Sequence, residues 1–175
     1  MGSGKSTLGR GLASAFNCRF IDLDDYIEEK WSMSITTIFA KKGEEWFRNE
    51  ECSSLKEIVQ EYEYLNSKEN YTLVLALGGG TLTNASSAEV VRNCTRCVYL
   101  QCSKEVLLGR LIKNNSRRPL LAGKNEHDMS DAIDSLMEKR EVIYRSTASV
   151  VYDTTEKRIG RVIMEFGEMF ALQAK

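Results

Sequence analysis

Four short apolar runs alternate along the chain with longer segments whose apolar residues recur at helical spacing. The runs are typical of buried strands and comprise residues 19–24, 71–80, 96–102 and 149–154. The helical segments lie near residues 6–16, 44–66, 84–92, 103–113, 129–145 and 156–172. Strands that alternate with helices predict an α/β fold, with a parallel sheet covered by helices on both faces. Ligands of such sheets bind beyond the carboxyl ends of the strands, so functional residues are expected there.

The length and composition of the chain limit the classes of protein to which it can belong. Its 175 residues fit a single domain, 1–175, with a sizeable core. A formal net charge of −1 gives no electrostatic reason to expect binding to nucleic acid or to a membrane surface. No apolar run reaches the length of a membrane span, and the five cysteines form no disulfide framework. We therefore expect a cytoplasmic protein, and we expect it to act as a monomer.

The first residues, "MGSGKST", resemble the end of a phosphate-binding loop, G-x-x-x-x-G-K-[ST]. Glycines allow backbone amides to turn inward around an anion, and the helix predicted to follow would direct its N-terminal dipole at the same anion. The residues expected to bind ATP here are Gly2, Ser3, Gly4, Lys5, Ser6 and Thr7. Lys5 would reach the β- and γ-phosphates, and the Ser6 hydroxyl would bind Mg²⁺. The alternative, a flexible remnant of an expression tag, does not explain the amphipathic helix that follows directly.

The first predicted strand ends in "DLD". Residues two apart in a strand point to the same side, so Asp22 and Asp24 are expected to share one side of the sheet edge. One carboxylate could serve Mg²⁺ through water, and the other could hold a substrate hydroxyl. Alternatively, Asp24 caps the helix that begins near Tyr26, although capping explains one aspartate rather than two.

The second strand ends in three consecutive glycines, Gly78, Gly79 and Gly80. Three glycines exceed what a plain turn needs, and they allow a substrate to lie directly on bare backbone. No aspartate ends this strand, so the carboxylate on the metal side would have to be Asp22.

Two arginines interrupt apolar helix faces. On a helical wheel, Arg48 falls inside the apolar arc of the segment 44–66, which spans about 120°. Arg140 falls near the centre of the apolar stripe of the segment 129–145. Arginines rarely face inward without an anionic partner, so the pair predicts a pocket for a small acid. The alternative is that each arginine pairs with a buried carboxylate or extends its charged end to solvent.

The polar segment "NNSRRPLLAGKNEHD" (114–128) holds the chain's single proline and two arginines. It predicts a lid that closes over a nucleotide, with one arginine reaching the transferred phosphate. An ordinary long loop is the alternative.

Taken together, "GSGKST", "FIDLD", "GEEWFRNEE", "LALGGGTLT", "RRPLLAG" and "MEKREVIY" resemble the shikimate kinase family, in family order and spacing. The resemblance implies a three-layer P-loop kinase fold, with a lid at about 112–128 and a shikimate-binding region at about 24–66. It implies catalytic roles for Lys5, Asp24 and Arg118, with Asp24 holding ring hydroxyls.

The resemblance also implies the remaining roles. Arg110 and Arg118 would contact ATP, and Asp22 would act on Mg²⁺ through water. The substrate positions would be Asp24, Arg48, Gly78, Gly79, Gly80 and Arg140. The cofactor would be Mg²⁺, and the partners shikimate and ATP.

One departure from the family pattern concerns the sheet. The family has five parallel strands, whereas four are visible here, and the strand and first glycine that should precede the phosphate loop are missing. Either the first residue of the sequence is assigned wrongly by several positions, or the chain is truncated. If the chain truly begins at Met1, we expect weak folding and little or no activity.

The expected activity is ATP-dependent phosphorylation of the shikimate 3-hydroxyl, a step of aromatic amino acid biosynthesis. One alternative is another small-molecule P-loop kinase, of the gluconate or adenylylsulfate type. A neutral sugar would not need two inward arginines, and a nucleotide acceptor would need an added base-binding segment. A second alternative is a non-catalytic protein of the same fold.

Overall fold

The computed structural model describes residues 2–69, 72–113 and 126–174. The helices are α1 (Lys5–Ala15), α2 (Leu23–Trp31), α3 (Ile35–Lys42), α4 (Glu44–Glu69), α5 (Ala85–Cys94), α6 (Lys104–Lys113), α7 (Glu126–Thr147) and α8 (Ile159–Met169), with one 3-10 turn, η1 (Thr81–Thr83). The strands are β1 (Arg19–Asp22), β2 (Leu73–Ala76), β3 (Val98–Gln101) and β4 (Val150–Asp153). The four predicted strands and six predicted helices are therefore confirmed, with shifted ends.

The strands form two parallel pairs, in which β1 lies beside β2 and β3 lies beside β4. The prediction of parallel strands is confirmed. Among the described residues, however, the four strands do not form one continuous sheet, because β2 and β3 are not hydrogen-bonded to each other. A cavity of about 750 Å³ lies between them.

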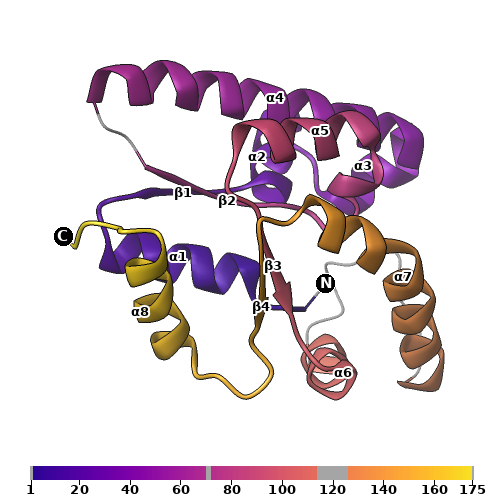
Figure 1. Cartoon of the computed structure of the whole chain (residues 1–175). Coiled ribbons are helices and arrows are strands. Elements are labelled where there is room, and N and C mark those ends of the chain that lie inside the picture. Colours follow the sequence, from indigo (N-terminus) through magenta and orange to yellow (C-terminus); the bar gives the residue numbers. More distant parts are fainter. Residues whose placement is uncertain (1, 70–71, 114–125, 175) are drawn as a thin grey trace.

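Helices cover the strands on two sides (Figure 1). Helices α2, α3, α4 and α5 lie on one side of the β1–β2 pair, and α1 lies on the other with α8 beside it. Helices α6 and α7 pack against each other through the buried side chains of Leu111 and Ile133. The architecture is the three-layer α/β arrangement that the alternating pattern predicts.

Two separate apolar cores stabilise these layers. The larger one joins α2–α5 to the β1–β2 pair, and its centre includes Leu23, Ile27 and Ile38, which have no exposed surface. The second core joins α1 and α8 to β3 and β4 through Leu12, Leu100 and Phe166. Val74 of β2 also packs against the second core, so α1 contacts both strand pairs, whereas α2–α5 cover mainly the β1–β2 pair.

Helix α3 was not predicted from the sequence pattern, and a helix at the position of α2 was considered only in the alternative that Asp24 caps a helix carrying Tyr26. Helices α2 and α3 are 9 and 8 residues long, too short for a clear apolar periodicity. Local signals define their ends instead: the Ser34 hydroxyl accepts a hydrogen bond from the Thr37 amide at the start of α3, and Gly43, with φ of 85°, ends it.

Most of the predicted lid, residues 114–125 with Arg118, lies outside the described residues. Among the helices of the described part, none has the length and apolar character needed to cross a membrane.

Candidate active site

The glycine-rich loop precedes α1 directly. Gly4 is the N-cap of this helix and has φ of 91°, a left-handed conformation that glycine adopts without strain. Its carbonyl accepts a hydrogen bond from the Leu8 amide at 2.9 Å, so the loop joins the helix as its first turn. Residues 2–8 line a cavity of about 440 Å³, which is bounded on other sides by Arg110, Thr154 and Lys157. Backbone amides at a helix start beside such a cavity suit a phosphate group.

Arg110, for which the resemblance implies a nucleotide contact, lies beside the glycine-rich loop. Its Nη1 donates to the Gly2 carbonyl at 3.2 Å and approaches the Cys102 sulfur at 3.8 Å. The side chain therefore connects α6 to the glycine-rich loop and borders the same cavity.

Ser6 and Asp22, the two residues predicted to act on Mg²⁺, contact each other. The Ser6 hydroxyl donates to Asp22 Oδ2, which joins the start of α1 to the end of β1. The other carboxylate oxygen of Asp22, Oδ1, accepts a hydrogen bond from the Asp24 amide at 3.1 Å and so caps α2. The alternative that Asp24 is the cap is therefore wrong. The predicted strand geometry is also wrong, since β1 ends at Asp22 and Asp24 lies in the first turn of α2.

Asp24 has an unusual electrostatic environment. Burial, followed by repulsion from the carboxylates of Glu51 and Asp22, raises its pKa from 3.8 to about 6, although Lys5 and Arg48 act in the opposite direction. A carboxyl group whose pKa lies close to neutrality suits general acid–base work. These interactions bring Asp24 together with charged groups from α1 and α4.

Arg48 projects from α4 into a polar network. Its Nη1 donates to Glu51 at 2.6 Å, and its Nη2 donates to Glu44 at 3.0 Å. The guanidinium also lies 5.3 Å from the ring centre of Phe47. Burial opposes its charge, but the two carboxylates leave its pKa raised. The alternative that Arg48 pairs with a buried carboxylate is therefore confirmed, and the prediction that it faces inward is confirmed as well.

The glycine turn after β2 lies directly against this network. A Cβ at position 80 would come within 2.4 Å of Arg48 Cζ, and one at position 78 within 2.5 Å of Glu51 Oε1. The same Glu51 oxygen accepts a hydrogen bond from the Thr81 hydroxyl at 2.5 Å. A Cβ at either position would displace the end of the Arg48 or Glu51 side chain, so in this arrangement bare backbone at the turn faces the arginine.

Arg140 approaches the same turn from α7. It is 9% exposed, which agrees with its predicted inward position. Tyr144, one helical turn away, donates its hydroxyl to the Gly79 carbonyl at 2.5 Å. Burial raises the pKa of Tyr144, whereas the charge of Arg140 and its hydrogen bond to Tyr144 lower it. Helix α7 therefore places Arg140 and Tyr144 together at the glycine turn.

Sequence reasoning did not assign Glu51, Thr81 or Tyr144 to the site. Glu51 is only 1% exposed, and it holds both Arg48 and Thr81. A signal was present, because Glu51 follows Arg48 by three residues and shares its helix face. Tyr144 follows Arg140 by four residues in the same way, but a tyrosine in an apolar stripe gives no sign of a polar role.

The fold and the loop define the chain as a P-loop kinase domain. The family model described as shikimate kinase matches residues 1–171. The chain belongs to the shikimate kinase family.

Individual relatives with similar sequences are also shikimate kinases. A shikimate kinase of Chlorobium limicola is 40% identical over 169 residues, which cover 94% of this chain and 79% of the relative. One of Thioalkalivibrio sulfidiphilus is 35% identical over 175 residues, covering 100% of this chain and 85% of the relative.

Solved structures show the same likeness. A shikimate kinase of Acinetobacter baumannii in complex with shikimate is 32% identical with a TM-score of 0.84, covering 98% of this chain and 88% of that one. A shikimate kinase of Bacteroides thetaiotaomicron is 30% identical with a TM-score of 0.85, covering 98% and 94%.

Proposed function

We propose that this protein transfers the γ-phosphate of ATP to the 3-hydroxyl of shikimate, giving shikimate 3-phosphate and ADP. The observation that supports this proposal best is the grouping of two cationic side chains and one carboxyl around a single glycine turn. Arg48, Arg140 and Asp24 belong to three different helices, and each is buried or half-buried near the residues 78–80.

The acid end of the substrate would lie between the arginines. A guanidinium offers two parallel donors that match the two oxygens of a carboxylate. Arg48 is held from behind by Glu51, and Arg140 is bonded to Tyr144, so both are oriented before substrate arrives. The bare backbone of the glycine turn allows the ring to approach closely.

The nucleotide would bind at the glycine-rich loop. Lys5 would neutralise charge on the phosphates, and Arg110 would border the nucleoside. Arg118 is proposed to contact the transferred phosphate from the lid.

Mg²⁺ fits the residues at the loop. The Ser6 hydroxyl and the Asp22 carboxylate already bond to each other, and both are the hard oxygen donors that Mg²⁺ prefers. Ser6 would hold the ion directly and Asp22 through water, and the bound ion would supply charge neutralisation at the phosphates.

The transfer itself requires mainly alignment. The 3-hydroxyl oxygen forms a bond to the γ-phosphorus, the bond from that phosphorus to the β-phosphate oxygen breaks, and ADP leaves. Asp24 orients the hydroxyl and accepts its proton, which a carboxyl with a pKa of about 6 can do at neutral pH. All of these groups come from one chain, so no second copy is required.

Two alternatives remain distinct from this proposal. A kinase for gluconate or adenylylsulfate would use the same loop with another acceptor. A non-catalytic protein would bind shikimate without turnover.

ADP release in the presence of ATP, Mg²⁺ and each acceptor separates these possibilities. Turnover with shikimate alone, and a product phosphorus signal that couples to the ring proton at carbon 3, supports the proposal. Turnover only with gluconate or adenylylsulfate, or calorimetric binding of shikimate without any ADP release, contradicts it. Arg140→Ala should raise the KM for shikimate about 100-fold and leave the Kd for ATP unchanged, because it removes one carboxylate contact.

A further inference from the structure

The hydroxyl of Tyr144 connects helix α7 to the backbone of the glycine turn. It donates to the Gly79 carbonyl at 2.5 Å, and its oxygen accepts a hydrogen bond from the Arg140 guanidinium. Because burial raises the pKa of Tyr144, the hydroxyl keeps its proton at neutral pH and remains a donor to Gly79. A single oxygen atom therefore joins a buried arginine to the turn.

The two arginines at the turn are supported in different ways. Arg48 pairs with the carboxylates of Glu44 and Glu51. Arg140 is buried, and within the part of the chain that the structure describes its side chain forms no ion pair with a carboxylate. A buried guanidinium needs acceptors for its N–H groups, and the uncharged Tyr144 oxygen supplies one. Tyr144 thus restricts the orientation of Arg140 without neutralising its charge.

The hydrogen bond to Gly79 also orients a backbone donor. The C=O of Gly79 and the N–H of Gly80 belong to one trans peptide, so they point in opposite directions. With the carbonyl held by Tyr144, the Gly80 N–H faces away from Tyr144. No described residue accepts a hydrogen bond from this amide. Gly80 lies directly against Arg48, so its amide is a donor available to a ligand that Arg48 binds.

We propose that Tyr144 is a positioning residue for the acid end of the acceptor, because it orients the Arg140 guanidinium and the Gly80 amide so that both can donate to one carboxylate. This inference rests on the proposed function, which supplies shikimate as the acid. Tyr144 acts through these two groups and does not itself contact the substrate. Its hydroxyl therefore contributes to selectivity for an acid over an uncharged acceptor of the same shape.

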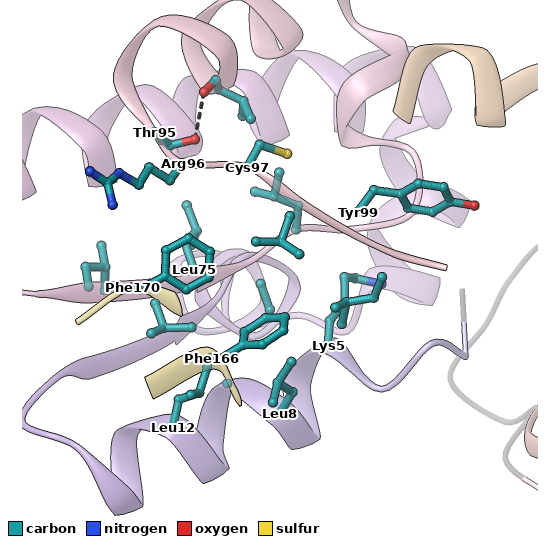
Figure 2. Close-up of a pocket in the computed structure, with 18 of the residues that line it drawn as sticks. Lys5, Leu8, Leu12, Leu75, Thr95, Arg96, Cys97, Tyr99, Phe166 and Phe170 are labelled. Carbon is teal, nitrogen blue, oxygen red and sulfur yellow. Dashed lines mark hydrogen bonds between the residues drawn. The ribbon is translucent and has the colours of Figure 1, made fainter. Parts of the chain in front are cut away.

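Tyr99 of β3 provides a matched control. Its ring centre lies 5.3 Å from that of Tyr144. Burial raises the pKa of Tyr99 to about 12, so it is also a protonated, partly buried tyrosine. Its hydroxyl points away from the other labelled side chains in Figure 2 and makes no hydrogen bond with a described residue. Tyr99→Phe therefore removes a comparable hydroxyl without touching the glycine turn.

The test compares the unchanged chain with Tyr144→Phe and Tyr99→Phe. Calorimetry measures the Kd for shikimate, and ADP release measures kcat and KM. Tyr144→Phe should raise the Kd and the KM for shikimate about tenfold, and should leave kcat and the Kd for ATP within about twofold, because the glycine-rich loop is not altered. Tyr99→Phe should change none of these values by more than about twofold. The uncharged methyl ester of shikimate should bind all three proteins with Kd values within about twofold of one another.

A double-mutant cycle shows whether Tyr144 acts through Arg140. In the Arg140→Ala chain, adding Tyr144→Phe should raise the Kd for shikimate less than about threefold. A tenfold loss in both backgrounds, an equal loss for shikimate and its methyl ester, or equal effects of Tyr144→Phe and Tyr99→Phe would overturn the proposal.

Failure of the proposed function gives a different result. If the unchanged chain binds shikimate without releasing ADP, the proposed function fails, while the Kd values still decide the role of Tyr144. If the unchanged chain does not bind shikimate at all, both are overturned.

Discussion

The two sides of this molecule place their charges in different ways. On the substrate side, formed by residues 19–94, Glu51 is almost completely buried and orients Arg48 and Thr81 from within the core. On the nucleotide side, formed by residues 2–15, 98–113 and 150–169, the charged group Glu165 instead makes ion pairs at the surface, with Lys157 at 2.7 Å and Arg161 at 2.7 Å. The difference indicates that the groups proposed to bind the acid are held in place from within the core, whereas the ion pairs on the side proposed to bind the nucleotide lie at the surface.

The largest effect is expected from the loop itself. Lys5→Ala should lower kcat about 1,000-fold, because the charge that stabilises the transferring phosphate is lost. ADP release measures this change, and circular dichroism checks that α1 remains folded. Lys5→Arg keeps the positive charge and should retain more activity than Lys5→Ala, so equal rates in the two variants would contradict the role of the charge.

Asp24→Asn should lower kcat/KM about 100-fold while ATP binding persists, because the amide cannot accept the proton. For the unchanged chain, kcat/KM should fall as the pH drops below about 6, the value to which the pKa of Asp24 is raised. Unchanged kcat/KM in the variant would remove Asp24 from the site.

The same substitution should increase stability. The folded state holds the Asp24 proton more tightly than the unfolded state, so the stability that this group contributes is fully present below pH 3.8 and is lost as the pH rises through about 6. Asp24→Asn removes this loss and should raise the free energy of unfolding at pH 8 by roughly 1–3 kcal/mol, with no difference near pH 3. Urea denaturation at both pH values measures it, and an equal gain at the two would contradict the assigned cause.

A smaller effect should come from the buried support of Arg48. Glu51→Gln should raise the KM for shikimate about tenfold and lower the free energy of unfolding by about 2 kcal/mol, because it removes a buried charge that pairs with Arg48. Glu44→Gln is the matched control: it removes the exposed partner, and should cost less than about 0.5 kcal/mol. If both variants behave alike, the buried carboxylate has no special role.

The smallest effect is expected at the surface of the nucleotide side. The partners Lys157, Tyr152 and Arg161 lower the pKa of Glu165 to about 2. The stability that they provide is present above pH 4.5 and is lost as the pH falls through 2. Glu165→Gln should shift the Tm at pH 7 by no more than about 2 °C, since exposed ion pairs contribute little. A larger shift would show that the two sides do not differ as described.

The sequence predicted the elements with strong periodicity and the residues that break it. Arg48 and Arg140 were found because an arginine in an apolar face is visible on a helical wheel. The short helix α3 was not found, because eight residues give little more than two turns of pattern. The position of Asp24 was predicted on the wrong element, because the change from strand to helix after Asp22 depends on a local cap rather than on periodicity.

The pattern of apolar runs could not predict which strands pair, although the resemblance, which implies a fifth strand before the phosphate loop, did predict that the sheet lacks an inner strand. Each strand reads as a buried apolar run, and such a run does not reveal which edges are paired. Likewise, the hydrogen bond from Tyr144 to Gly79 joins residues 65 positions apart, so only the tertiary structure shows it.

The double pairing of Arg48 has a consequence for how the site fills. The guanidinium of Arg48 is already paired with two carboxylates of the same chain, the buried Glu51 and the exposed Glu44. Glu44 therefore competes with any incoming carboxylate for the Arg48 guanidinium. Under the proposed function, the carboxylate of the incoming substrate would displace Glu44 from Arg48, rather than bind an unpaired guanidinium. The displaced Glu44 would still be accommodated, because it begins α4, where the helix end favours negative charge.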